Sequence, residues 1–181
     1  MFETGLNAWL AEDIAVRRAR EVDAGFDPRR HATARTYRYT IYNAPARSPL
    51  TRDRAWHVSS PLDVEAMREA ATALVGEHDF ASFTRDEGVS TVRCVRRCDI
   101  VLDPPTVVVE MMANAFLRQQ VRRTVGALVK VGSGKLTPQA FRGLLAQPKL
   151  GTAGPVAPPH GLCLEEIAYQ GLDLTNGNAL S

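Results

Sequence analysis

Two β-strands joined by a tight turn limit the fold of this chain more than any other feature. Residues 92–102 and 106–113 are rich in apolar side chains, and Asp103-Pro104-Pro105 separates them. So short a connection, containing two prolines, is typical of an antiparallel hairpin. We therefore expect a sheet whose neighbouring strands run mainly antiparallel.

Residues 33–42 form the next clearest strand. Tyr37, Tyr39 and Ile41 alternate with polar residues, so their side chains share one face of the strand. Arg38 belongs to the opposite face. Shorter strands are expected at residues 14–22, 54–58 and 162–169.

Three helices are expected between these strands. The first takes Ser60 as its N-cap, and its apolar stripe extends to Val75. The others span residues 115–131 and 138–146, each with an apolar stripe or a capping signal. Because strands and helices alternate without a strict β-α-β order, we predict an α+β domain with a mainly antiparallel sheet backed by helices.

Composition agrees with one globular domain. The 181 residues are 45% hydrophobic and 23% charged, which excludes a disordered chain. No apolar run approaches the roughly 20 residues of a membrane helix, and the N-terminus does not resemble a secretory signal. Three cysteines, Cys94, Cys98 and Cys163, are too few for a disulfide framework. We therefore expect a cytoplasmic protein with no membrane partner.

Arginine makes up 19 of the 22 basic residues, although the net charge is only +2. A guanidinium group matches phosphate oxygens and stacks on bases, so an Arg-rich stretch is compatible with nucleic acid. On one expected strand, cations alternate with aromatics in the manner of single-stranded nucleic-acid sites. These residues are Arg35, Tyr37, Arg38 and Tyr39. Two other interpretations remain open: a GC-rich genome that encodes Arg in place of Lys, and tyrosines that only fill the core.

The second expected helix carries arginines beside its apolar stripe. Arg118 and Arg122 are four residues apart, which places them on one helix face. An Arg beside a buried stripe must be paired or point into a cleft, where a phosphate or a carboxylate suits it. The alternative is a solvated helix face, above all for Arg118 and Arg123.

Cys94 and Cys98 come nearest to a metal-ligand pair. Spaced four apart on an expected strand, they would share one face, but no second pair of ligands stands near them in the sequence. His57 and His78 have no nucleophile motif beside them. The sequence therefore predicts no metal site.

Several short stretches occur in a fixed order between residues 6 and 169, and together they resemble one family. They include Ala34-Arg35-Thr36-Tyr37-Arg38-Tyr39, Leu74-Val75-Gly76-Glu77-His78-Asp79-Phe80, Asn114-Ala115-Phe116-Leu117 with Gln120-Val121-Arg122-Arg123, and Pro158-Pro159-His160-Gly161-Leu162. In this order they resemble the bacterial tRNA pseudouridine synthase A family.

The resemblance implies an isomerase that converts uridine to pseudouridine in the anticodon stem-loop of tRNA, with no metal or organic cofactor. It also implies that Tyr37 packs against a flipped-out base and that Arg122 orients the catalytic aspartate. We expect further substrate contacts from four other arginines, and a homodimer, as in family members. These arginines are Arg29, Arg35, Arg38 and Arg118.

One departure from the family is large. The family's catalytic aspartate lies in a Gly-Arg-Thr-Asp-Ala-Gly motif, which this sequence does not contain. We therefore expect a truncated chain whose residues 1–31 link to a missing N-terminal half. Residues 32–170 are then a synthase-like α/β domain, and residues 171–181 are a C-terminal tail. Alone, such a chain is expected to be inactive and to self-associate.

Two other functions remain open. The chain is either a catalytically inactive module that still binds tRNA, or an Arg-rich α+β domain that binds another anionic ligand. Salt-sensitive tRNA binding without product would indicate the first, and failure to bind RNA at low salt would indicate the second.

Overall fold

The computed structural model describes residues 2–85, 88 and 90–172, and the chain divides into two compact units, Met1–His31 and Ala32–Ser181. The first unit contains one short helix, α1 (Phe2–Asn7), followed by irregular and largely exposed chain. The Asn7 side chain organises this unit, because it donates to the Val16 carbonyl at 2.8 Å and accepts from the Val16 N–H at 2.7 Å.

The prediction of a strand at residues 14–22 is wrong. A strand needs a neighbour to satisfy its backbone groups, and no other described segment of the first unit offers one. Side chains take that role instead. Besides the Asn7 contacts, the Ala19 N–H donates to Glu3 Oε1 at 3.1 Å. These backbone N–H contacts, the Glu3 and Ala19 amides, lower the pKa of the Glu3 carboxyl.

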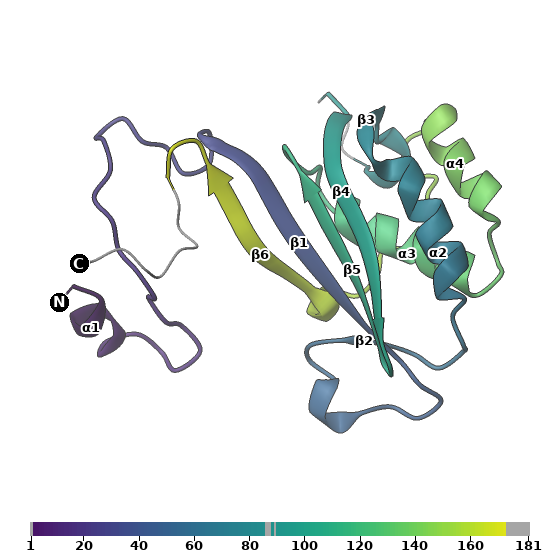
Figure 1. Cartoon of the computed structure of the whole chain (residues 1–181), viewed down its shortest axis with the longest axis horizontal. Helices are drawn as coiled ribbons and strands as arrows, with labels where there is room; N and C mark the ends of the chain where they lie inside the picture. The colour runs from purple at the N-terminus through teal and green to yellow at the C-terminus, as the bar shows by residue number, and fades with distance from the viewer. Residues whose placement is uncertain (1, 86–87, 89, 173–181) are drawn as a thin grey trace. The chain divides into compact units, whose positions relative to one another are not determined.

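The second unit is built on one sheet (Figure 1). Its strands are β1 (Ala32–Asn43), β2 (Trp56–Val58), β3 (Gly76–Asp79), β4 (Val92–Asp103), β5 (Thr106–Ala113) and β6 (Leu162–Tyr169). Their order is β2-β1-β5-β4-β3, and β6 also pairs with β1. All pairs are antiparallel except β1 with β2, so the predicted sheet and its β4–β5 hairpin are confirmed.

Strand β1 has two neighbours on the same edge. Strand β6 pairs with its first part, ending with Leu162 opposite Tyr39, and β2 pairs with its last part, beginning with Trp56 opposite Ile41. The start of β6 and the start of β2 therefore meet along β1, two residues apart. This junction separates the two hollows discussed below.

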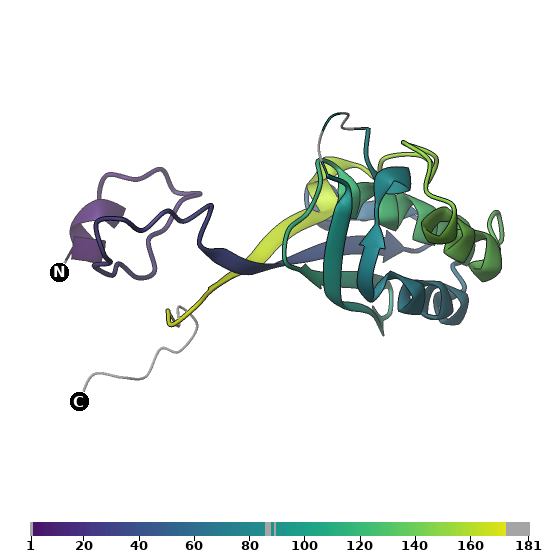
Figure 2. The same ribbon diagram turned by 90° about the horizontal axis from the view of Figure 1, so that it is seen from above.

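Three helices, α2 (Val64–Ala71), α3 (Gln120–Gly132) and α4 (Pro138–Ala146), lie on one face of the sheet (Figures 1 and 2). Between them and the sheet is a single apolar core that includes Tyr39, Met111, Leu128 and Phe141. Each such side chain, fully buried, stabilises the fold by roughly 1.5–3 kcal/mol. The predicted α+β class with helices backing a mainly antiparallel sheet is confirmed.

The ends of two helices differ from the prediction. Asp63, not Ser60, caps α2, because Asp63 Oδ1 accepts the Ala66 N–H at 2.9 Å. Val75 lies outside the buried stripe and is 47% exposed. Helix α3 begins at Gln120 rather than residue 115, since Gln119 adopts a left-handed conformation with a φ of 61° that no helix can contain.

Candidate functional site

A pocket of about 370 Å³ opens where β1 meets the chain leading into α3 and the start of β6. Its lining combines aromatic, apolar and cationic side chains. They include Tyr37, Phe116, Arg118, Gln120, Arg122 and Leu162. The volume lies at the lower end of small-ligand sites, which suits one planar base.

Tyr37 and Phe116 form the aromatic wall of this pocket. Their rings meet edge to face, with centroids 5.2 Å apart and planes at 89°. Both side chains are half-buried, so each keeps part of its ring toward the pocket. Sequence reasoning did not select Phe116, although it stands two residues before the selected Arg118.

The segment between Phe116 and α3 is held in an unusual turn. Gln120 is fully buried, and its Oε1 accepts the Leu117 N–H at 2.8 Å. The Gln120 backbone N–H donates to the Leu117 carbonyl at 3.1 Å. The left-handed Gln119 between them costs about 1 kcal/mol, a strain that persists where the surrounding structure fixes the backbone. Gln119 and Gln120 therefore shape the rim of the pocket, a role that the sequence did not predict.

Arg122 is anchored at its stem and open at its tip. Its Nε donates to the Ala157 carbonyl at 2.6 Å, and the Ala157 N–H donates back to the Arg122 carbonyl at 3.1 Å. Among the described residues, no hydrogen bond or ion pair engages its two terminal nitrogens. A guanidinium held in this way presents two parallel N–H donors, the geometry that a carboxylate or a phosphate accepts.

A close approach between α3 and residues 151–158 makes this anchor possible. A Cβ on Gly126 would lie 2.1 Å from the Pro155 carbonyl oxygen, so only glycine lets this loop lie against the helix. Tyr39 fastens the end of the same loop, since its hydroxyl donates to the Pro158 carbonyl at 2.7 Å. Burial raises the pKa of Tyr39, against a smaller opposing effect of the Arg122 cation.

Arg123 does not lie on a solvated helix face, so that alternative is wrong for this residue. It is 3% exposed and donates from Nη1 to the Gly154 carbonyl at 3.2 Å. Burial, and secondarily the nearby Arg85 cation, lower its pKa. Arg118 is exposed and lines the pocket, but it precedes α3 and does not share a helix face with Arg122 as expected.

Arg35 and Arg29 lie outside the pocket lining. Arg35 Nη1 donates to the Asn114 carbonyl at 2.9 Å, which fixes the chain just before Phe116. Arg29 belongs to the first unit, in a turn where Asp27 Oδ1 accepts the N–H groups of Arg29 and Arg30 at 2.8 and 2.9 Å. These contacts, that of Arg30 first, lower the pKa of Asp27.

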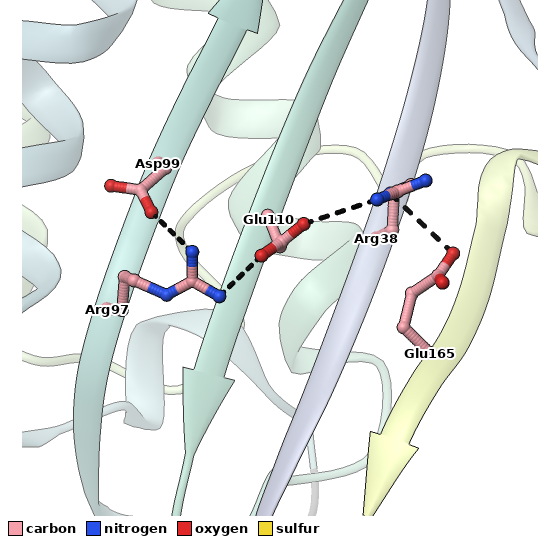
Figure 3. A network of polar contacts seen from close by, with 5 residues as sticks. All are labelled: Arg38, Arg97, Asp99, Glu110 and Glu165. Carbon is pink, nitrogen blue, oxygen red and sulfur yellow. Dashed lines mark hydrogen bonds and ion pairs between the residues drawn. The ribbon is translucent and has the colours of Figure 1, made fainter. Parts of the chain in front are cut away.

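Arg38 lies on the sheet face opposite the helices, within a row of charges that crosses four strands (Figure 3). It lies 3.6 Å from Glu110 on β5 and 3.6 Å from Glu165 on β6. Glu110 also pairs with Arg97 on β4, which in turn meets Asp99 at 2.9 Å. Burial alone would lower the pKa of Arg97. Its contacts with Glu110 and Asp99 have a larger combined effect, so the pKa of Arg97 is raised. Any contact of Arg38 with RNA would have to compete with these carboxylates.

Cys94 and Cys98 do not share a face, contrary to expectation. The pairing of β4 with β5 shifts register between Val95 and Arg97, which brings Val95 and Cys98 to the same buried face. Cys94, next to Val95, therefore points the other way. Burial, with a smaller contribution of Asp99, raises the pKa of Cys98 to about 12.

Across residues 2–85, 88 and 90–172, no group of three or more His, Cys, Asp or Glu side chains could hold a metal ion.

Comparison with known proteins identifies the family of this chain. Residues 70–170 match the family described as tRNA pseudouridine synthase. The tRNA pseudouridine synthase A of Geobacter sulfurreducens is 48% identical over 171 residues, which cover 93% of this chain and 70% of that protein. Its namesake in Geotalea uraniireducens is 44% identical, over 93% of this chain and 70% of the relative. That of Neisseria gonorrhoeae is 41% identical, over 92% and 64%.

The fold is consistent with one class of protein, the RNA-modifying isomerases, to which these relatives belong by name. The chain belongs to the tRNA pseudouridine synthase family, as the order of its motifs predicted. None of the helices among the described residues has the length and apolar character needed to cross a membrane.

Proposed function

We propose that the pocket binds a uracil base flipped out of the anticodon stem-loop of tRNA, as part of a site that converts uridine to pseudouridine. The observation that carries this proposal is the meeting of Tyr37 and Arg122 in one pocket, from β1 and α3. An aromatic ring stacks on any base, and a flipped nucleotide needs such a surface to replace the stack it leaves.

The reaction is an isomerisation that needs no oxidant or reductant. The bond from ribose C1′ to uracil N1 breaks, the uracil turns, and a bond from C1′ to C5 forms. C5 loses a proton and N1 gains one, so atoms and charge balance. In this proposal Tyr37 and Phe116 hold the uracil plane while the ring turns, and no metal or organic cofactor takes part.

Arg122 acts as a positioning residue in this proposal. Its terminal nitrogens bind the carboxylate of the catalytic aspartate, while the Ala157 carbonyl fixes its stem. The described lining of the pocket contains no carboxylate, and the 181 residues contain no Gly-Arg-Thr-Asp-Ala-Gly motif. We therefore propose that this chain alone binds tRNA without forming pseudouridine, because the nucleophile must come from a segment bearing that motif.

Arg118 and Arg35 contribute substrate contacts at the edge of the site. Arg118, at the pocket rim, is suited to a phosphate beside the flipped nucleotide, and Arg35 supports the segment that carries Phe116. Arg29 remains a proposed RNA contact outside the pocket, and Arg38, which lies 3.6 Å from both Glu110 and Glu165, is proposed to make only a minor one. The bacterial cytoplasm, where tRNA is modified, is the proposed location, and a homodimer is the proposed assembly.

The test is pseudouridine formation on an unmodified tRNA with uridines in its anticodon stem-loop. The purified chain is expected to form no product, and to form it when a polypeptide that carries the Gly-Arg-Thr-Asp-Ala-Gly motif of the family is added. Product from the chain alone would contradict the proposed lack of a nucleophile. Arg122→Gln is expected to abolish the complemented activity, whereas Arg142→Gln, on α4, is expected to leave it unchanged.

A second candidate function is tRNA binding without catalysis. The open tip of Arg122 and the aromatic wall would serve it equally well. Salt-dependent tRNA binding without product in the complemented reaction would support it. A chain that binds other polyanions but not tRNA would favour the third candidate, an Arg-rich domain for another anionic ligand.

A further inference from the structure

A second hollow, of about 540 Å³, lies beside the proposed uracil pocket but shares no lining residue with it. The connection from β1 to β2 supplies most of its lining, strand β2 adds Trp56 and His57, and the 3₁₀-helix η4 (Pro159–Gly161) adds His160. The charged and aromatic side chains of the lining are Arg47, Arg52, Trp56, His57 and His160. No carboxylate belongs to this lining, so the hollow attracts anions.

Arg47 is the main cation of this hollow. Its side chain is exposed, and within the part of the chain that the structure describes no hydrogen bond or ion pair engages it. Arg52, by contrast, is already paired with Asp53 at 3.0 Å. Arg47 therefore has its full set of donors ready for a phosphate.

His57 is held in a defined orientation. Its Nε2 lies 2.8 Å from the Ala44 carbonyl, and since a carbonyl only accepts, Nε2 must carry a hydrogen. Nδ1 of the neutral ring then remains as a hydrogen-bond acceptor, which suits a ribose hydroxyl. His160, from η4, is exposed and adds a second imidazole ring to the lining.

Trp56 provides an aromatic surface in the same hollow. Its ring is half-buried and meets the buried Tyr39 ring edge-on, with planes at 89° and centroids 6.4 Å apart. This contact fixes the indole from one side and leaves its other part in the lining. A fixed indole beside Arg and His combines a stacking surface with phosphate donors, the pairing that single-stranded nucleic-acid sites use.

The two hollows are adjacent along one strand edge. Leu162 lines the uracil pocket and His160, two residues earlier, lines the second hollow. Tyr37 and the Trp56 partner Ile41 are four residues apart on β1, a separation of about 13 Å. An RNA strand whose flipped nucleotide enters the pocket can therefore continue into the second hollow.

We propose that this hollow is a second RNA subsite, in which Arg47 and His160 bind a backbone phosphate, Trp56 supports a neighbouring base or ribose, and His57 accepts a hydrogen bond from a ribose hydroxyl. The inference rests on the proposed function, because it extends the path of the same RNA beyond the uracil pocket. It assigns a substrate-binding role to Arg47, Trp56, His57 and His160.

The test measures binding of an unmodified tRNA anticodon stem-loop to the full chain over a series of salt concentrations. Arg47→Gln is expected to weaken binding about tenfold and to lower the salt slope by about 0.7–0.9. Arg142→Gln, whose guanidinium pairs with Glu69 on the helical layer, is the matched control and is expected to change neither. Thermal melting of each variant checks that the fold is intact.

Fluorescence gives an independent measurement. The chain has two tryptophans, so Trp9→Phe leaves Trp56 as the single reporter. The stem-loop is expected to quench Trp56 emission in this variant, and Arg47→Gln is expected to weaken that quenching. If inorganic phosphate quenches Trp56 as strongly as the RNA, the hollow is a small-anion site and the RNA assignment is overturned.

The outcomes also separate this inference from the proposed function. If the wild-type chain binds the stem-loop but Arg47→Gln binds equally well, the second subsite is wrong and the uracil pocket stands. If Arg47→Gln weakens binding and Tyr37→Ala does not, the second subsite stands and the proposed pocket is wrong. If the wild-type chain does not bind at low salt, both are wrong.

Discussion

The two faces of the sheet are built on opposite principles. The face toward the helices is apolar and tightly packed, and the pocket where Tyr37 and Arg122 meet opens at its edge. The opposite face, called the open face here, carries a row of alternating charges in which each arginine lies between two carboxylates (Figure 3). On the packed face a cation is left open, and on the exposed face the cations are satisfied.

This contrast indicates which face is prepared for a ligand. A surface ion pair adds little stability, and its carboxylates already balance the charge that would attract a phosphate. Arg122, anchored through one nitrogen and open at two, keeps its binding capacity because the fold, not a carboxylate, holds it. A side chain with unpaired hydrogen-bond donors beside an apolar wall is therefore a better guide to function than the number of charged residues.

The largest expected effect comes from disturbing the packed face. Gly126→Ala would place a methyl group 2.1 Å from the Pro155 carbonyl oxygen and push the 151–158 loop off α3. We expect a loss of about 3 kcal/mol in the free energy of unfolding, measured by urea denaturation.

Gly143→Ala is the matched control for Gly126→Ala. Gly143 lies inside α4 with no atom within 4 Å of its would-be Cβ, so alanine is expected to stabilise the chain by roughly 0.5–1 kcal/mol. Equal effects of the two substitutions would contradict the close approach of loop and helix.

The next largest effect concerns the pocket itself. Tyr37→Ala removes the stacking surface and is expected to weaken binding of the tRNA stem-loop about tenfold, while Tyr37→Phe retains most of the affinity. Arg38→Gln, one residue along on the open face, is expected to change affinity no more than about twofold, since Glu110 and Glu165 already hold its cation. Filter binding at one salt concentration measures all three, and a larger loss for Arg38→Gln would place the RNA on the open face.

A smaller effect is expected for the open face. Glu110→Gln removes the carboxylate shared by Arg38 and Arg97, and should cost about 1 kcal/mol of unfolding free energy at low salt and less at about 1 M. Asp53→Asn, in an exposed pair with Arg52, should cost almost nothing. An effect of Glu110→Gln that does not depend on salt would mean that packing, not charge, holds this face.

The smallest effect is a dependence on alkaline pH that belongs to the packed face. Burial raises the pKa of Cys98 from its ordinary 9.0 to about 12. Its neutral thiol therefore stabilises the fold fully below about pH 9, and this contribution is lost as the pH rises toward 12. Urea midpoints between pH 7.5 and about 10.5 should fall less steeply for Cys98→Ala than for the wild type; parallel curves would contradict the burial of the thiol.

Patterns with a period set by the backbone were predicted correctly from sequence. The alternation around Tyr39 and the turn at Asp103-Pro104-Pro105 define β1 and the β4–β5 hairpin because they depend only on local geometry. Features decided by distant contacts were not. The register shift beside Val95 separates Cys94 from Cys98, and the left-handed Gln119 delays the start of α3.

The candidate site shows the same division. Tyr37 and Arg122 were selected because a family resemblance named them, and the structure brings them into one pocket. Tyr37 contacts Phe116, 79 positions away, and Arg122 donates to Ala157, 35 positions away. Contacts between residues so far apart cannot be predicted from a local sequence pattern. The buried Arg123 was missed because its partner, the Gly154 carbonyl, also belongs to a distant loop.

The most direct test of the proposed pocket is to find which face of the sheet contacts the base. A tRNA anticodon stem-loop carrying 4-thiouridine in place of uridine, photocrosslinked to the chain and mapped by mass spectrometry, reports the residues in contact with it. We predict crosslinks to Tyr37 or Phe116 in the pocket. Crosslinks confined to the open face around Glu110 and Arg97 would contradict this prediction.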